Sequence, residues 1–447
     1  MLDSTASPSR VILIAAGLLL GSSVLAAELP ECSPSSYRRF EVVDEDDQVS
    51  KIDPVAADPQ PRWAADASQQ PHDWQPLDPD RAHFAGPIPF VLPPEEASGE
   101  PFYNHNHQPD ITWLPNGDLL AIWYSTERES GTELTVLASR LRAGRDQWDP
   151  SAEFFKAEER NMHGNSVFYD DETGILHHIN GMGRKGATGW ANLALLHRYS
   201  RDNGVTWSVA RPISSGANYQ LRHQVIAGMV RTSDGSLIQP CDATPGGQGP
   251  TAIHVSRDGG RTWSDPGGDI RGIHAGVEEL ENGRLLAFGR GQAIEDRMPM
   301  SISQDMGQTW EYLASPFPVI GSGQRLVLRR LQEGPLLFVS FTGQRNDTTG
   351  IPFADQAGNE FEGIGMFAAL SYDEGETWPV RKLLTPGEGR YDGGAHHRWF
   401  VATPTRAEHG GYLAATQSPD GVVHLISSRL HYQFNLKWLE TPSPAVP

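Results

Sequence analysis

The chain has 447 residues, a formal net charge of −20 and two cysteines, Cys32 and Cys241. A surface this acidic disfavours nucleic acids and anionic membranes as partners, although a local cationic pocket can still bind an acidic small ligand. Two cysteines allow at most one disulfide, between Cys32 and Cys241, so a hydrophobic core has to stabilise the fold.

The first residues have the features of an export signal. Arg10 precedes an apolar run of 15 residues from Val11 to Leu25, and the small residues Ala26 and Ala27 follow it. The run is shorter than the about 20 residues that a membrane-spanning helix needs. We therefore predict a signal peptide over residues 1–27, a secreted or periplasmic protein, and no membrane span.

Residues 28–98 are rich in Pro, Asp, Ala and Gln. This composition predicts an irregular N-terminal extension.

A turn motif, Ser-x-Asp-x-Gly-x-Thr-Trp, then recurs along the chain. Its Ser and Asp side chains can accept hydrogen bonds from backbone N–H groups, its Gly can adopt a positive φ, and its Trp can bury a large apolar face. We call these segments the Trp turns; four copies are complete and one is degenerate, at Ser200–Trp207, Ser256–Trp263, Ser303–Trp310, Ser371–Trp378 and, degenerate, Ser139–Trp148.

A second motif, a tight turn ending in Gly before an apolar strand, occurs six times, at Gly117, Gly174, Gly235, Gly283, Gly334 and Gly421. Each of the first five is followed by a Trp turn. Such units predict small antiparallel sheets arranged radially, which is an all-β, six-bladed β-propeller over residues 99–440 with a tail at 441–447. The sixth unit has no Trp turn, so we expect an N-terminal strand to complete the last blade.

The repeat register also predicts where a site lies. Residues 9 to 13 positions before each hairpin Gly should converge near the axis, and they are His105, His107, His163, Asn165, Arg222, His223, His274, Gln324, Arg325 and Tyr412. The returning strands bring Tyr124, Asn180, Asp242 and Arg290 to the same end. Arg can bind a carboxylate through two hydrogen bonds, and His and Tyr can transfer protons. We expect an axial pocket for an anionic ligand, bordered by the insertions Gln344–Glu362 and Gly387–Gly410; in the alternative interpretation these side chains only fill the channel.

The Trp turns resemble the Asp boxes, or BNR repeats, of the sialidase superfamily, and the resemblance covers about residues 100–440. It looks closest to bacterial sialidase-like BNR proteins without an assigned substrate. Sialidases bind the substrate carboxylate with three arginines and use a Tyr nucleophile paired with Glu, together with an Asp acid/base. The family pattern of Tyr followed eight residues later by Asp-Gly matches Tyr412 and Asp420-Gly421, which implies Tyr412 as nucleophile, and Arg290 matches the second arginine.

The sequence also departs from the family pattern. His107-Gln108-Pro109 stands where sialidases carry the first arginine, His274 stands where they carry the Glu, and the segment Glu362–Leu370 lacks the third arginine, for which Arg325 could partly substitute. The catalytic candidates are therefore Tyr412, His274, His107 and Glu129, the last chosen among the carboxylates Glu127, Glu129 and Glu133. The substrate-binding candidates are Arg290, Arg325, Arg222, His223, His105, His163, Asp242 and Tyr124.

Three functions follow from these features. The first is an exo-acting glycoside hydrolase that removes a sialic- or uronic-acid-type sugar from a glycan. The second is a polysaccharide lyase that cleaves a uronic-acid glycan by β-elimination, and the third is a glycan-binding propeller without catalysis. In each case the expected partner is an acidic oligosaccharide bound by a monomer. No cofactor is expected, and the alternative is a divalent metal on His105 and His107.

Overall fold

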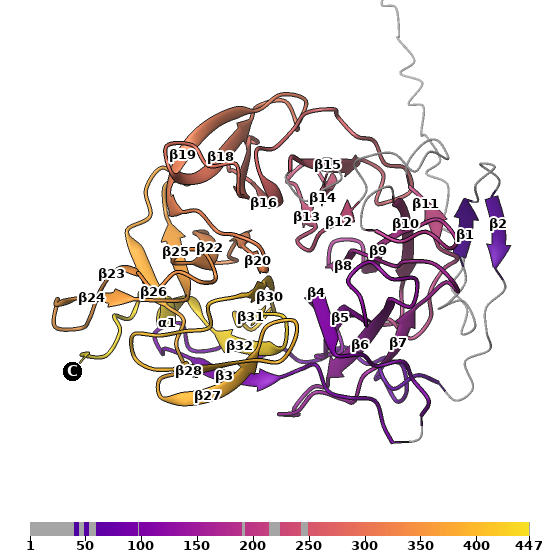
Figure 1. The fold of residues 1–447 in the computed structure, drawn as a ribbon, viewed down its shortest axis with the longest axis horizontal. Coiled ribbons are helices and arrows are strands. Elements are labelled where there is room, and N and C mark those ends of the chain that lie inside the picture. The colour runs from indigo at the N-terminus through magenta and orange to yellow at the C-terminus, as the bar shows by residue number, and fades with distance from the viewer. Residues whose placement is uncertain are drawn as a thin grey trace, which may run out of the picture.

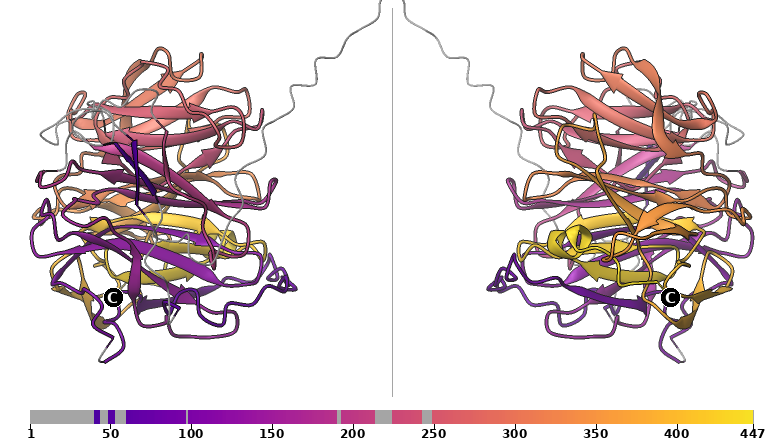
Figure 2. Two further views of the ribbon diagram at one scale, coloured as in Figure 1. Left: turned by 90° about the vertical axis from the view of Figure 1, so that its right-hand side faces the viewer. Right: turned by 90° about the vertical axis from the view of Figure 1, so that its left-hand side faces the viewer.

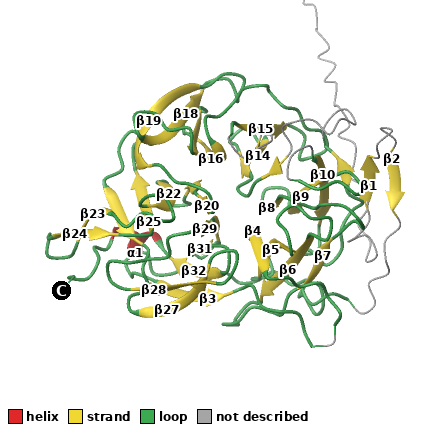
Figure 3. Cartoon of the chain, viewed as in Figure 1, coloured by secondary structure: helices red, strands yellow, loops and turns green. Residues whose placement is uncertain are grey.

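The computed structural model describes residues 60–96, 98–189, 193–213, 224–242 and 249–446, together with the backbone of the hairpin strands β1 (Phe40–Val43) and β2 (Val49–Ile52). The predicted signal peptide, Cys32, Arg222 and His223 lie outside the described residues. Strands and loops make up nearly all of the described chain, with one short helix, α1 (Leu436–Glu440) (Figure 3). No helix in these residues is long and apolar enough to cross a membrane.

Six antiparallel sheets lie around one axis, which confirms the predicted six-bladed propeller (Figure 1). Blade one contains β4 (His105–Trp113), β5 (Leu119–Thr126), β6 (Thr135–Leu141) and β7 (Ala152–Phe155). Blade two contains β8 (Asn165–Asp170), β9 (Ile175–Met182), β10 (Ala194–Ser200) and β11 (Arg211–Pro212). Blade three contains β12 (Gln224–Val225), β13 (Val230–Arg231), β14 (Leu237–Asp242) and β15 (Thr251–Ser256).

Blade four contains β16 (Ile273–Glu279), β17 (Leu285–Arg290), β18 (Arg297–Ser303) and β19 (Glu311–Pro318). Blade five contains β21 (Val327–Arg330), β22 (Leu336–Phe341), β25 (Met366–Ser371) and β26 (Val380–Leu383). Blade six contains β30 (Ala414–Gln417), β31 (Val423–Ile426), β32 (Leu430–Phe434) and, as its outer strand, β3 (Phe84–Pro89). The second and third strands of the blades are almost entirely buried, so the core lies between the faces of neighbouring blades.

The last blade is completed from the N-terminal side, as the missing Trp turn predicts. β3 pairs antiparallel with β32, with Phe84 opposite Phe434. The next residue after β3, Phe90, is fully buried, and its ring lies 5.4 Å from Trp123 of blade one. The side views show blade six beside blade one (Figure 2). The strand that closes the ring therefore lies inside the segment 28–98.

Each Trp turn is stabilised by its own side chains. In Ser200–Trp207, Asp202 accepts hydrogen bonds from the backbone N–H of Thr206 at 2.9 Å and from its hydroxyl at 2.6 Å. The Trp207 indole N–H donates to the Gly204 carbonyl at 2.9 Å, so the buried ring leaves no donor unpaired. The same contacts recur in the other three complete copies.

Both predicted insertions contain hairpins. β23 (Ile351–Ala354) pairs with β24 (Glu360–Gly363), and β27 (Gly389–Gly393) pairs with β28 (Arg398–Ala402). A short parallel pair, β20 (Gln324–Arg325) with β29 (Gly411–Tyr412), joins the entries of blades five and six. This pair brings Arg325 opposite Tyr412, which places two predicted site residues side by side.

Candidate active site

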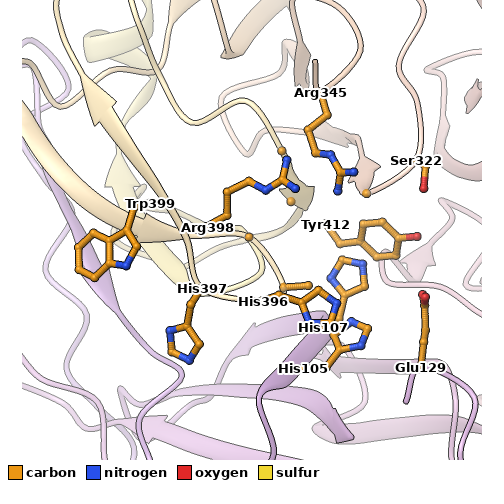
Figure 4. Close-up of a pocket in the computed structure, with 15 residues that line it drawn as sticks. His105, His107, Glu129, Ser322, Arg345, His396, His397, Arg398, Trp399 and Tyr412 are labelled. Atoms are coloured by element: carbon orange, nitrogen blue, oxygen red, sulfur yellow. The ribbon is translucent and has the colours of Figure 1, made fainter. Parts of the chain in front are cut away.

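A cavity of about 510 Å³ opens where the first strands of the blades begin (Figure 4). It lies at the starts of β4, β20 and β29, next to the β27–β28 hairpin, which is the end of the propeller that the repeat register predicts. Its lining residues are His105, His107, Glu129, Ser322, Gly323, Arg345, Gly394, Ala395, His396, His397, Arg398, Trp399, Gly410, Gly411 and Tyr412.

Three residues from three blades form a series of close polar contacts. The Tyr412 hydroxyl lies 2.9 Å from His274 Nε2, and His274 Nδ1 lies 2.6 Å from Asp242 Oδ2. His274 has a left-handed backbone conformation (φ 55°), uncommon for a residue with a side chain, and its N–H donates to Asp242 Oδ1 at 2.8 Å. Asp242 thus holds both the ring and the backbone of His274.

The protonation states of Tyr412, His274 and Asp242 fix the direction of proton transfer among them. Burial lowers the pKa of His274 to about 3, so the imidazole is neutral at neutral pH. Burial opposes ionisation of Asp242, but its contacts with His274 hold the pKa of the carboxyl below its usual value. An ionised carboxylate can only accept, so His274 donates from Nδ1 and its Nε2 is left to accept the proton of Tyr412.

Two arginines contact the Tyr412 side chain. Arg290 Nη1 donates to the Tyr412 hydroxyl and to the Gln324 carbonyl, each at 3.1 Å. The guanidinium of Arg325 lies 4.5 Å from the centre of the Tyr412 ring. Arg325 is only 2% exposed, and its three guanidinium nitrogens are buried with no hydrogen-bond partner among the described residues. A buried guanidinium in this state is ready to bind an anion.

His107 packs against the other side of Tyr412, with ring centres 3.8 Å apart. Its Nδ1 lies 3.0 Å from the Ser428 hydroxyl, which also accepts the Tyr412 backbone N–H at 3.1 Å. His105 lies 3.8 Å from His396 between ring centres. Burial lowers the pKa of His105 to about 4 and that of His107 well below its usual value. These imidazoles are neutral at neutral pH, so the positive charge of the site comes from its arginines.

Tyr124, His163 and Glu129 form a separate group on blades one and two. His163 Nδ1 donates to the Glu129 carbonyl at 2.9 Å, and its Nε2 accepts from Gln108 at 2.9 Å and Gln224 at 3.1 Å. Both ring nitrogens of His163 are thus occupied by protein groups, and its contact with substrate stays a prediction.

Asp242 was also predicted to bind substrate. Its side chain is 1% exposed and contacts His274, a position from which it can orient the imidazole. Its contact with substrate stays a prediction.

Tyr124 is fully buried, with its hydroxyl 3.5 Å from Glu129 Oε1, and so it contacts a carboxylate rather than the cavity. Glu129 reaches the cavity, and burial among the surrounding groups raises the pKa of its carboxyl. A carboxyl with a raised pKa beside a cavity is a candidate proton donor.

Several lining residues were not predicted, namely Arg345, Ser322, Arg398 and Trp399. His396 and His397 were not predicted either; they lie in the turn between β27 and β28, and both line the cavity. The only sequence feature that indicated His396 and His397 is their place in the long insertion Gly387–Gly410. Among the described residues, no group of three His, Cys, Asp or Glu side chains is arranged to hold a metal ion. His105 and His107 therefore have no third ligand of these types there.

Comparisons with known proteins agree with this architecture. Residues 117–425 match the family model of the BNR repeat-like domain. A sialidase from Micromonospora viridifaciens is 25% identical over 382 residues, covering 74% of this chain and 51% of the relative, so the chain spans about half the length of that protein. An intramolecular trans-sialidase from Ruminococcus gnavus has a TM-score of 0.50 at 12% identity, over 77% of this chain and 96% of that one.

Two further solved structures share the fold. A protein of unknown function from Dyadobacter fermentans has a TM-score of 0.52 at 14% identity, over 78% of this chain and 98% of that chain. A sialidase from Streptococcus pneumoniae has a TM-score of 0.51 at 11% identity, over 78% of this chain and 71% of that chain. With its six blades and a family match over more than half of its length, the chain belongs to the sialidase superfamily of BNR-repeat proteins.

Proposed function

We propose that the protein is an exo-acting glycoside hydrolase that removes an acidic sugar, of the sialic- or uronic-acid type, from a glycan. The observation that carries the proposal is Arg325, a buried guanidinium with no partner in the described chain that lies directly against Tyr412. It provides a place for a sugar carboxylate beside a tyrosine with its own proton acceptor. The likeness to the Micromonospora viridifaciens sialidase supports this proposal.

In this mechanism Tyr412 is the nucleophile. Its hydroxyl oxygen bonds to the anomeric carbon while the glycosidic C–O bond breaks, and the phenolic proton moves to His274 Nε2. Asp242 stabilises the imidazolium that forms. Glu129 donates a proton to the leaving oxygen, and its carboxylate then takes a proton from the water whose oxygen bonds to the anomeric carbon. The sugar–tyrosine bond breaks in that step, and His274 Nε2 returns the proton to the departing Tyr412 oxygen, which restores both residues.

The arrangement suits a substrate that is itself negatively charged. A carboxylate nucleophile would repel the carboxylate of an acidic sugar, whereas a neutral phenol does not. Sialidases pair their tyrosine with one Glu, and here neutral His274 with ionised Asp242 carries the same net charge of −1. The negative charge lies one imidazole ring further from the reacting carbon.

The β-elimination alternative also has a specific observation in its favour. His107 contacts the Tyr412 ring, so a neutral imidazole and a phenol lie together beside Arg325. Such a pair can remove and deliver protons at a uronate that the arginine neutralises. The two reactions differ in product, because only elimination leaves an unsaturated sugar.

The test is an assay of the purified protein on acidic glycans and aryl glycosides, read by reducing-sugar release and by absorbance of unsaturated uronates. We expect sugar release without that absorbance, reduced at least about 10²-fold in Tyr412→Phe and in His274→Ala. Tyr372→Phe, at the exposed fifth Trp turn, is the matched control and keeps full activity. Unsaturated products would replace the proposal with the lyase, and glycan binding without turnover would replace it with the binding protein.

A further inference from the structure

We infer that the cavity contains a second anion-binding site, formed by Arg345 and Arg398, and that the substrate carries an acidic group on the unit next to the acidic sugar. The inference rests on the proposed function, since it names the substrate class of the same cavity. Arg345 follows β22, Arg398 begins β28, and both line the cavity. In Figure 4 their guanidinium groups point toward one another.

Neither guanidinium is neutralised by the described part of the protein. No described carboxylate forms an ion pair with Arg345 or Arg398, and the buried Nε of Arg345 has no hydrogen-bond partner there. Asp392, on the same hairpin as Arg398, instead contacts His397 at 2.6 Å. Burial and the charge of Arg398 lower the pKa of Arg345. Arg398 is exposed and Arg345 is half-buried, so water screens part of their mutual repulsion, and an anion bound between them would offset the rest.

The backbone around the two arginines is shaped to hold them. A Cβ on Gly323 would lie 2.7 Å from Arg345 Nη1, and one on Gly410 would lie 2.9 Å from its Cδ, so Arg345 runs through a slot between two glycines. The hairpin that carries Arg398 is tied to the propeller, because Asn106 N–H donates to the Ala395 carbonyl at 3.0 Å. A site held in this way binds without a large ordering cost.

The second site is distinct from the first. Arg290 and Arg325 lie against the Tyr412 side chain and are not among the residues that line the cavity, whereas Arg345 and Arg398 line it. The site therefore has two positive centres, an inner one of Arg290 and Arg325 buried against Tyr412 and an outer one of Arg345 and Arg398 on the cavity lining. An oligosaccharide with acidic groups on two adjacent units matches this arrangement, with the reacting sugar on the inner centre.

The experiment measures binding by titration calorimetry in the Tyr412→Phe background, where the probes are not cleaved. The probes are N-acetylneuraminic acid with its dimer, and galacturonic acid with its dimer. We expect one dimer to bind at least about tenfold more tightly than its monomer, as a charged hydrogen bond provides. Adding Arg345→Ala with Arg398→Ala removes that preference and leaves monomer affinity within about twofold, while Arg145→Ala, at an exposed position in blade one, preserves it.

The outcomes separate this inference from the proposed function. Equal affinity for monomer and dimer, or a dimer preference that survives in the variant lacking Arg345 and Arg398, overturns the second site alone. After either of those outcomes, the proposed function still holds if Arg325→Gln abolishes binding of the monomer. Failure of every probe to bind overturns both.

Discussion

The combination of Tyr412, His274 and Asp242 is the most informative feature at the scale of single residues. Asp242 lies behind His274 and away from the cavity, so its effect on a reaction passes through the orientation of the imidazole. A neutral amide in its place could donate to Nδ1, which would put the ring proton on Nε2, facing Tyr412. The ring would then be unable to accept the phenolic proton.

Asp242→Asn is therefore expected to lower kcat by about 10²- to 10⁴-fold with KM nearly unchanged. Steady-state kinetics on the substrate found in the glycan panel would measure this, with thermal unfolding to verify the fold. Asp171→Asn, which neutralises an exposed carboxylate, serves as the control. A kcat within twofold of the wild type would contradict the proton-transfer role of His274.

Residue-level prediction from the sequence succeeded where the backbone register alone decides position. Tyr412, His274, Arg290 and Arg325 precede or end strands that meet at one end of the propeller, and they do contact one another. The repeat could not show the partners of His163, because Gln108 and Gln224, which contact its Nε2, lie 55 and 61 positions away along the chain. The same limit applies to Ser428, whose contacts join residues more than 300 positions apart.

At the scale of elements, the Trp turns stabilise the blades without contacting the cavity. Asp202→Ala removes acceptors for the Thr206 backbone N–H and hydroxyl and for the Ser200 hydroxyl. We expect a loss of about 1–2 kcal/mol in the free energy of unfolding, with kcat unchanged. Urea titration beside the assay would measure both, with exposed Arg201→Ala as control. A change in kcat at constant stability would show that this turn communicates with the site.

The elements that repeat were predictable, and the elements that do not repeat were not. In each complete Trp turn the Asp and Trp side chains find their partners within the eight residues, so its structure is fixed by local sequence. In the degenerate copy the Trp148 indole donates to His431 instead. The β27–β28 hairpin has no such motif, and its position depends on a hydrogen bond from Asn106 in another blade. The sequence therefore indicated that a long insertion borders the site but not which of its side chains face it.

At the scale of the whole molecule, buried imidazoles make stability depend on pH. In the unfolded chain a histidine takes up a proton below its ordinary pKa of about 6.5. In the folded protein burial lowers the pKa to about 4 or about 3, so the unfolded state binds more protons and is favoured as the pH falls. The fully buried histidines of this kind are His163, His177, His274 and His424.

Two buried carboxyls act in the opposite direction. Burial raises the pKa of Asp110 to about 6 and that of Glu408 to about 7, so the folded state binds these protons first. The four histidines outnumber them, and we expect stability to fall between pH 6 and pH 4.5 by about 1.4 kcal/mol per pH unit or more. Urea denaturation across this range would measure the slope. A midpoint that stays constant or rises on acidification would contradict the burial of these rings.

Closure of the ring is the other whole-molecule property that the sequence predicted. The absent sixth Trp turn required a strand from the N-terminal side, and β3 fulfils that requirement by pairing with β32. Export and cellular location stay predictions, because residues 1–27 lie outside the described chain.

The β27–β28 hairpin leaves the propeller and returns to it at one place, since Gly389 and Ala402 are paired across its base. The strands that carry Tyr412, His274 and Asp242 lie outside this hairpin, whereas Arg398 lies within it. Under the proposed function, substrate preference can therefore be altered within the hairpin residues without changing the strands that carry the reacting groups.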